Sequence, residues 1–178
     1  MAHTSPVTCL DHHPASGVLI TGGYDGRVIA THDGHELWVA TFPDLVNDVR
    51  VDDRGTRVAV AVADYYAYVL DAATGWIMAA LGPHGDDVNV VRWMPSTGQP
   101  STGQASTDRL VCTMDHHDPT VRIWTHADGA WTCRTLAHHD SGVFGAAVSP
   151  DGSCIATAAE DGTARIWDTA TGTELHVL

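Results

Sequence analysis

Residues 159–172 read AEDGTARIWDTATG, and residues 62–75 read VADYYAYVLDAATG. When the two stretches are aligned without a gap, Asp161 falls on Asp64 and both stretches end in Ala-Thr-Gly. Self-similarity of this kind at a regular spacing is the signature of repeat architectures, in which each copy is one structural unit. The rest of the chain carries two more copies of the pattern.

The further copies are HDPTVRIWTHADG at 117–129 and YDGRVIATHDG at 24–34. The shared aspartate therefore recurs at positions 25, 64, 118 and 161. The longest spacing contains the polar, duplicated segment STGQPSTGQAST at 96–107, which cannot offset its own ordering entropy and is expected to be a disordered loop. We expect one domain of four units, at about residues 3–41, 42–81, 82–136 with the insert 96–107, and 137–178.

Each unit contains four short apolar runs separated by turn residues. In the last unit the runs are 143–148, 154–158, 163–167 and 174–178, and the breaks are SPDGS, AEDG and DTATG. Runs of about five residues with Asp-Gly turns are typical of antiparallel strands rather than of helices. The sequence therefore predicts an all-β fold of sixteen strands.

With these repeats, the chain resembles the WD-repeat family, whose unit is a propeller blade of about 40 to 45 residues with G-H near its start and W-D near its end. The fourth unit matches best, with His139, SPDG and RIWD. The third keeps His84 and RIW, and the first keeps His3 and TGGYDG. The second is weakest, with Phe42 in place of His and Leu70 in place of Trp. The resemblance implies a β-propeller.

The resemblance also implies a hydrogen-bonded chain of His, Ser or Thr, Asp and Trp inside each blade. The matching positions are His139, Thr157, Asp161 and Trp167 in the fourth unit, His84, Thr113 (or Cys112), Asp118 and Trp124 in the third, His3 and Asp25 in the first, and Asp64 in the second. A buried carboxylate has to accept hydrogen bonds, and imidazole, hydroxyl and indole groups donate them. We therefore expect these residues to be structural, although His, hydroxyl and Asp superficially resemble a hydrolase triad.

No catalytic, metal-binding or cofactor-binding residues are predicted. The chain has three adjacent histidine pairs, but neighbours on a strand point to opposite faces and seldom bind one ion. The stretch TGGYDG lacks the lysine and the following helix of a phosphate-binding loop. Two alternatives to a non-enzymatic scaffold stay open: an enzyme or metal-binding propeller with a site at its central channel, and a sensor fragment of a larger signalling protein.

The charge of the chain excludes several classes of partner. Its 178 residues include nine arginines, no lysine and 22 acidic residues, which gives a net charge of -13 at pH 7. Proteins that bind nucleic acids or anionic membranes use clustered Lys and Arg, and this chain has no such cluster. The composition thus predicts neither a nucleic-acid-binding nor a membrane-binding protein.

Targeting and redox signals favour the cytoplasm. The N-terminal residues MAHTSPVTCLDHHP lack the basic start and apolar run of a secretory signal. The four cysteines stand singly, without a CxxC pair, and are expected to be reduced, small apolar residues. Arginine without lysine suggests a GC-rich, bacterial genome.

In a propeller of this family, the loops before each first strand and between the second and third strands lie on one face. The resemblance therefore implies a partner-binding face, which would comprise Tyr24, Asp44, Tyr65, Tyr66, Asp86, Asp87, His116, His117, Asp140 and Glu160. Aromatic side chains among acids suit a basic protein or peptide. The alternative is that these loops are ordinary solvated turns.

Four blades raise the question of how the end faces are covered, because a blade buries each face only against a neighbour. Two copies could pair about a two-fold axis to give eight blades. Another polypeptide could supply further blades, or the chain could be a fragment of a longer propeller. A closed ring of four blades ranks below these, because it needs a sharper angle between blades.

Overall fold

The computed structural model describes residues 2–95, 108–115 and 117–178. The predicted disordered insert, residues 96–107, and His116 lie outside the described residues. The described ranges contain sixteen strands and no helix, and the strands form four separate four-stranded antiparallel sheets. The predicted all-β fold of four blades is confirmed.

Each blade consists of four strands that follow one another in the chain and pair in that order. Blade 1 contains β1 (Val7–His13), β2 (Val18–Gly23), β3 (Arg27–His32) and β4 (His35–Thr41). Blade 2 contains β5 (Val46–Val51), β6 (Arg57–Val62), β7 (Ala67–Asp71) and β8 (Ile77–Leu81). Blade 3 contains β9 (Val88–Trp93), β10 (Asp108–Met114), β11 (Thr120–Ala127) and β12 (Ala130–His138). Blade 4 contains β13 (Val143–Val148), β14 (Cys154–Ala159), β15 (Ala164–Asp168) and β16 (Glu174–Val177).

The turns between the second and third strands depend on the residue after the repeated aspartate. In blades 1 and 4 this residue is Gly26 or Gly162, with a positive φ of 69° or 84°. A Cβ on Gly26 would lie 2.8 Å from the carbonyl oxygen of Phe42, so glycine is needed there for space as well as for conformation. Blade 2 has Tyr65 at this position with φ of 72°, which is unusual for a bulky side chain.

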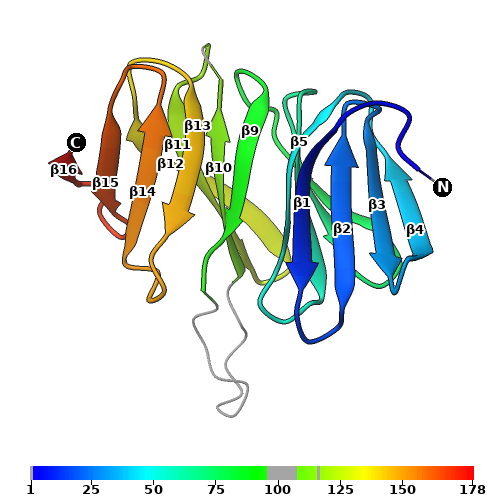
Figure 1. The fold of residues 1–178 in the computed structure, drawn as a ribbon. Coiled ribbons are helices and arrows are strands. Elements are labelled where there is room, and N and C mark those ends of the chain that lie inside the picture. The colour runs from blue at the N-terminus through cyan, green and yellow to red at the C-terminus, as the bar shows by residue number, and fades with distance from the viewer. Residues whose placement is uncertain (1, 96–107, 116) are drawn as a thin grey trace.

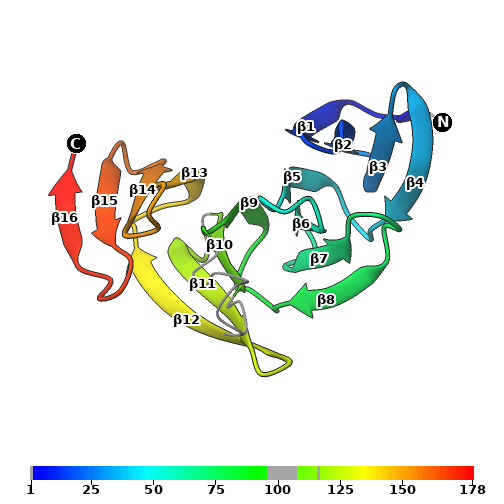
Figure 2. The ribbon, with the colours of Figure 1, turned by 90° about the horizontal axis from the view of Figure 1, so that it is seen from below.

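The blades stand side by side (Figure 1), and the view along the axis shows their first strands innermost and their fourth strands outermost (Figure 2). Seen along the propeller axis, they follow an open arc with blade 1 at one end and blade 4 at the other (Figure 2). Strands β1, β5, β9 and β13 contact one another in sequence order, which joins each blade to the next. The arc is therefore not the closed ring of four blades that the sequence left open.

The hydrophobic core lies between the blades rather than inside one sheet. Between blades 1 and 2, Ile20 and Ala30 lie in the same cluster as Val58 and Val60. A second cluster lies between blades 2 and 3, and a third between blades 3 and 4. The apolar alternation along each strand thus serves to bury both faces of every internal blade.

In each of blades 1, 2 and 3, a polar side chain at an equivalent position joins the blade to the next one. It lies on the first strand and donates a hydrogen bond to the carbonyl that opens the next blade: Thr8 to Val46 (2.6 Å), Asn47 to Val88 (2.9 Å) and Asn89 to Val143 (3.4 Å). The repetition fixes the register between neighbouring blades.

Ion pairs also cross the interface between blades 2 and 3. The carboxylate of Asp48 pairs with Arg92, and that of Asp108 pairs with both Arg54 and Arg57. Both aspartates are buried, so their charges are compensated at the interface rather than by water.

Candidate functional site

The loops that precede the first strands and join the second to the third strands lie along the upper edge in Figure 1. We call this edge the loop face. It carries both the predicted hydrogen-bonded chains and the predicted binding residues, except that His116 lies outside the described residues.

In blade 4, the four residues named for the hydrogen-bonded chain are linked one to the next in the order Asp161, His139, Thr157 and Trp167. Nε2 of His139 is 2.6 Å from the hydroxyl oxygen of Thr157, and its Nδ1 is 3.1 Å from Asp161. The indole nitrogen of Trp167 donates to the same threonine hydroxyl at 2.8 Å. This hydroxyl is buried and accepts the indole hydrogen, so it is held inside the blade rather than presented to a substrate.

Asp161 links this chain to the loop face. It accepts hydrogen bonds from the hydroxyl and the backbone N–H of Thr163 and from the backbone N–H of Asp140. The hydroxyl of Thr163, followed by these N–H groups and His139, holds the pKa of Asp161 well below its usual range. The carboxylate is thus a structural acceptor that fixes the turn.

Blade 1 has the same arrangement without the tryptophan. His3 lies 2.9 Å from Asp25 through Nδ1 and 3.0 Å from the hydroxyl of Thr21 through Nε2, and Thr31 stands where the indole would be. Burial alone would raise the pKa of Asp25, but hydrogen bonds from His3 and two backbone N–H groups lower it to about 2.

In blade 3, Cys112 and not Thr113 occupies the position of Thr157. Cys112 lies opposite Arg122 in the β10–β11 register, as Thr157 lies opposite the matching arginine of blade 4. Thr113 faces the other way, because neighbours on a strand alternate, and donates to the carbonyl oxygen of Val143 at 3.0 Å. The prediction for Thr113 is corrected accordingly.

Because Cys112 has no hydroxyl, the hydrogen-bonded chain of side chains in blade 3 is incomplete. Nε2 of His84 and the indole nitrogen of Trp124 are buried and have no polar partner among the described residues. Burial, followed by the positive charge of Arg122, lowers the pKa of His84 to about 4. Asp118 is instead bound by Arg122 at 2.7 Å and by the hydroxyl of Thr120 at 2.6 Å.

Blade 2 replaces the chain with an aromatic pair that the motif did not reveal. Asp64 accepts a hydrogen bond from the Tyr68 hydroxyl at 2.6 Å, and the ring of Tyr68 packs 4.8 Å from that of Phe42. Tyr68 lies four residues after the repeated aspartate, where blades 3 and 4 have an arginine. Tyrosine in place of arginine at this position is the sequence feature that indicates the different arrangement in blade 2.

Five carboxylates from blades 2 and 3 gather on the loop face. Burial raises the pKa of Asp87, and the negative charges of Asp86, Asp44, Asp115 and Asp64 raise it further. These five residues come from four different loops, and we call them the acidic cluster. Two backbone contacts hold it: Asp115 N–H donates to the Asp87 carbonyl, and His117 N–H donates to the Asp86 carboxylate at 2.8 Å.

The predicted aromatic residues divide into two groups. Tyr24 and Tyr65 are about half exposed on the loop face, at 56% and 49%. Tyr66 is partly buried and packs toward Tyr68, with ring centroids 6.1 Å apart. His117 is exposed beside the acidic cluster.

The two predicted acidic residues of blade 4 are not members of the acidic cluster and contact residues of their own blade. Asp140 is 3.5 Å from Arg165, and Glu160 accepts a hydrogen bond from Ser141 at 2.8 Å. Arg165 offsets part of the negative charge at this end of the loop face, whereas the Ser141 hydroxyl supplies a hydrogen bond only.

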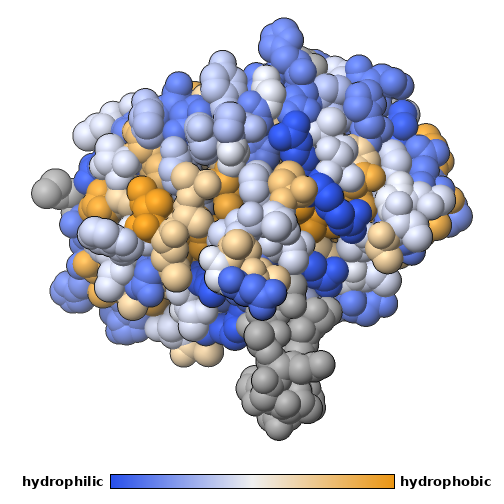
Figure 3. Space-filling view, turned by 180° about the vertical axis from the view of Figure 1, so that it is seen from behind, coloured by the Kyte–Doolittle hydropathy of each residue, from blue (hydrophilic) through white to orange (hydrophobic). Residues whose placement is uncertain are grey.

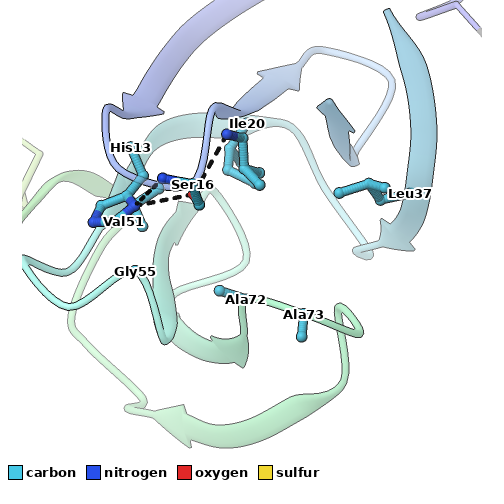
Figure 4. A pocket seen from close by; sticks show the side chains of 9 residues that line it. His13, Ser16, Ile20, Leu37, Val51, Gly55, Ala72 and Ala73 are labelled. Atoms are coloured by element: carbon cyan, nitrogen blue, oxygen red, sulfur yellow. Dashed lines mark hydrogen bonds between the residues drawn. The ribbon is translucent and has the colours of Figure 1, made fainter. Parts of the chain in front are cut away.

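A largely apolar pocket of about 310 Å³ lies between blades 1 and 2 (Figure 4). Val18, Ile20, Leu37 and Val51 are among its lining residues. At its edge, Nδ1 of His13 lies 3.0 Å from the hydroxyl of Ser16. The pocket is lined by the ends of β1 and β5, by β2 and β4, and by the turns after β1, β5 and β7, which place it away from the loop face.

The outer wall, seen in Figure 3, carries hydrophobic side chains in its middle band and hydrophilic ones along its upper rim. Ile77 and Met78, on the outermost strand of blade 2, and Trp76, directly before it, are exposed. Within the described ranges, no group of three or more His, Cys, Asp or Glu residues is arranged to hold a metal ion. No helix in those ranges is long and apolar enough to cross a membrane.

Residues 1–30 and 130–168 match the family model "WD domain, G-beta repeat". The guanine nucleotide-binding protein subunit beta of Oryza sativa subsp. japonica is 27% identical over 130 residues, which cover 71% of this chain and 32% of that protein. The small ribosomal subunit protein RACK1 of Medicago sativa is 40% identical over 95 residues, covering 53% and 26%. The predicted resemblance is confirmed, and the chain spans about a third of the length of the first of these relatives.

Two solved structures share the fold. The computationally designed Ika8 protein superposes with a TM-score of 0.78 and 22% identity, over 99% of this chain and 50% of the designed one. The computationally designed Ika4 protein superposes with a TM-score of 0.75 and 19% identity, over 95% of this chain and 94% of the designed one. At these identities the likeness concerns the fold alone.

Proposed function

We propose that this WD-repeat chain is a non-enzymatic, cytoplasmic scaffold that binds a basic protein or peptide segment through its loop face. The observation that carries the proposal is the acidic cluster. Five carboxylates from four loops lie on one face, and their negative charges add to burial in raising the pKa of Asp87, so the unbound cluster contains electrostatic repulsion.

A cationic partner would relieve that repulsion. Arginines on the strands that leave the loop face are already engaged, since Arg27 donates to the Ala2 carbonyl and Arg122 pairs with Asp118. An incoming guanidinium group would pair with carboxylates in a charge-assisted, bidentate geometry. The net charge of -13 would also accelerate the encounter with a basic segment.

The aromatic residues support the same face. Tyr65 holds a positive φ of 72° where two other blades use glycine, and its exposed side chain directly follows Asp64 in the same loop. A bulky residue in this conformation is strained, and such strain clusters at functional sites. Tyrosines at the rim of an acidic patch are suitable anchors for a peptide.

The buried His–Thr–Asp arrangement in blade 4 supports a non-enzymatic role. A nucleophilic hydroxyl has to reach a substrate, whereas that of Thr157 is buried between His139 and the indole of Trp167. We therefore propose that this hydrogen-bonded arrangement stabilises the blade and does not take part in catalysis.

The proposal is tested with a fluorescein-labelled peptide of alternating arginine and glycine, followed by fluorescence anisotropy at several salt concentrations. The double variant Asp86→Asn/Asp87→Asn should bind about tenfold more weakly, because two carboxylates are lost while the local hydrogen bonds can be kept. The affinity of the wild-type protein should fall as salt rises.

The matched control is Asp33→Asn/Asp128→Asn. These residues lie in turns at the opposite edge, both have positive φ values that asparagine tolerates, and the change in net charge is the same. This control should bind like the wild type. Equal loss in the two double variants would show nonspecific attraction only, and absence of wild-type binding would refute a basic partner.

A further inference from the structure

Every blade has two faces, and those at the two ends of the arc are not covered by a neighbour. We call the face toward the preceding blade the leading face and the face toward the following blade the trailing face. Strand register identifies equivalent positions in the four blades, because paired residues of the second and third strands point to the same face.

The trailing faces of blades 1, 2 and 3 each bury the same register pair: Ile20–Ala30, Ala59–Val69 and Val111–Ile123. In blade 4 this pair is Ala156–Ile166, of which Ala156 is exposed and Ile166 only partly buried. Ala158, further along the same face, is also exposed, although its equivalent Ala61 in blade 2 is fully buried. The trailing face of blade 4 therefore has the apolar composition of the faces that pack between blades, but no blade covers it.

The leading faces show the same contrast. The first strands of blades 2, 3 and 4 open with Val46, Val88 and Val143, all 0% exposed, whereas Val7 in blade 1 is 50% exposed. Three residues later, Val49 and Val91 are fully buried, whereas Leu10 is 60% exposed. The leading face of blade 1 is thus an apolar surface without its partner.

We propose that a second copy of this chain covers both end faces, so that two chains form a ring of eight blades about a two-fold axis. The trailing face of blade 4 in each copy packs on the leading face of blade 1 in the other. This inference does not rest on the proposed function.

Two features favour a second copy as the occupant. The uncovered faces are of opposite kinds and lie at the two ends of one arc, so a second arc presents the complementary face at each end (Figure 2). A symmetric pair buries both faces in two identical interfaces and leaves no open end.

The side chains also match an interface that exists within the chain. Between blades 2 and 3, Ala59 and Ala61 pack in one cluster with Val88, Val91 and Leu110. The new interface repeats this pattern, with small side chains on the trailing face of blade 4 and larger ones on the leading face of blade 1. The large members are Val7, Leu10 and Leu19, the last of which occupies the register position of Leu110.

Charge opposes this association and gives it a characteristic salt response. Each chain carries a net charge of -13, so two copies repel one another while their apolar faces attract. Added salt screens the repulsion and leaves the apolar contact intact. The pair should therefore tighten as salt rises, whereas a basic peptide on the loop face should weaken.

The experiment is light scattering on a sizing column with the 178-residue chain. The wild type should have twice the mass of one chain, and Ala156→Glu should have the mass of one. The control is Ala80→Glu, which places the same charge at another exposed alanine, on the outer strand β8, and should remain paired. Circular dichroism should show the same strand content in all three proteins.

A mixing experiment tests the ring itself. Leu10→Glu, on the opposite end face, should also run as single chains. In a mixed pair of Leu10→Glu and Ala156→Glu, both charges fall in one interface and the other interface is wild type. The mixture should therefore form two-chain species that neither variant forms alone.

Three results would overturn the proposal. One is a folded wild-type protein whose mass from light scattering is that of a single chain. Another is a wild-type mass greater than two chains, which would indicate open-ended association. The third is a mixture of the two variants that stays entirely single-chain.

Discussion

The indole nitrogen of Trp167 lies 2.8 Å from the hydroxyl oxygen of Thr157. The equivalent indole in blade 3, that of Trp124, has no polar partner among the described residues because a cysteine stands where the hydroxyl would be. One protein thus contains a completed and an incomplete version of the same hydrogen-bonded chain, and the two can be compared directly.

Thr157→Val should lower the free energy of unfolding by about 1–3 kcal/mol, because it keeps the shape but removes the partner of two buried nitrogen atoms. Urea denaturation followed by tryptophan fluorescence measures the change. Thr31→Val is the control, since Thr31 stands at the tryptophan position in blade 1, outside any completed chain, and should shift stability by less than about 0.5 kcal/mol. Equal effects in both variants would contradict this account.

Cys112→Thr should raise the free energy of unfolding by about 1 kcal/mol, because a hydroxyl at this position supplies a partner for His84 and Trp124. The same urea titration applies. Cys133→Thr, an exposed cysteine on β12, should have little effect and controls for loss of a thiol. A destabilised Cys112→Thr protein would show that the site has no room for the new hydrogen bonds.

His84 should make the protein less stable in mild acid. The unfolded chain protonates this imidazole near its ordinary pKa of 6.5, but the folded protein does so only near pH 4. Between these values the unfolded state binds more protons, so stability is lost as pH falls from about 6.5 to 4. The loss is roughly 3 kcal/mol, since one pKa unit corresponds to about 1.4 kcal/mol.

The matching variant is His84→Phe, which copies the residue that blade 2 uses at this position, Phe42. Urea midpoints measured between pH 7 and 4 should fall less steeply in this variant than in the wild type. Parallel curves for the two proteins would rule out His84 as the source of the acid sensitivity.

Asp108→Asn should lower the free energy of unfolding by about 2 kcal/mol, because it leaves Arg54 and Arg57 at the interface between blades 2 and 3 without their shared carboxylate. The expected loss is below that of a fully buried pair because Arg54 is 40% exposed. Asp53→Asn, a mostly exposed neighbour, should change stability by less than about 0.5 kcal/mol. Chemical denaturation would distinguish them, and a similar small effect for both would assign the interface to apolar packing alone.

The fold could be predicted from the sequence because its main determinants are local. Asp-Gly turns and short apolar runs recur with the repeated aspartate, and the strands of blade 4 begin and end within one residue of the predicted positions. The repeated aspartate could not reveal Tyr68, because its role depends on Phe42, which is distant in sequence but packs against its ring.

The assignment of Thr113 failed for a specific reason. The family pattern asks for Ser or Thr, and Thr113 is the hydroxyl-bearing residue in this part of β10. Blade 3, however, has two more residues between the end of β10 and Asp118 than blade 4 has between β14 and Asp161, so the equivalent of Thr157 lies six rather than four residues before the aspartate, at Cys112. A shift of one residue along a strand reverses the direction of its side chain. Similarly, the sequence could place Asp44, Asp86 and Asp87 on the loop face, but only the arrangement of the blades shows that their charges act on one another.

The order of contacts along the arc has a consequence for synthesis. Each blade packs on the blade before it in the chain, and within the described ranges no comparably extensive contact joins blade 1 to blade 4. Nascent chains emerge at roughly 5–20 residues per second, so each blade can dock on a neighbour that is already complete. The blades can therefore fold one after another from the N-terminus. Each new sheet packs on the completed sheet before it, and folding does not depend on a contact between blade 1 and blade 4.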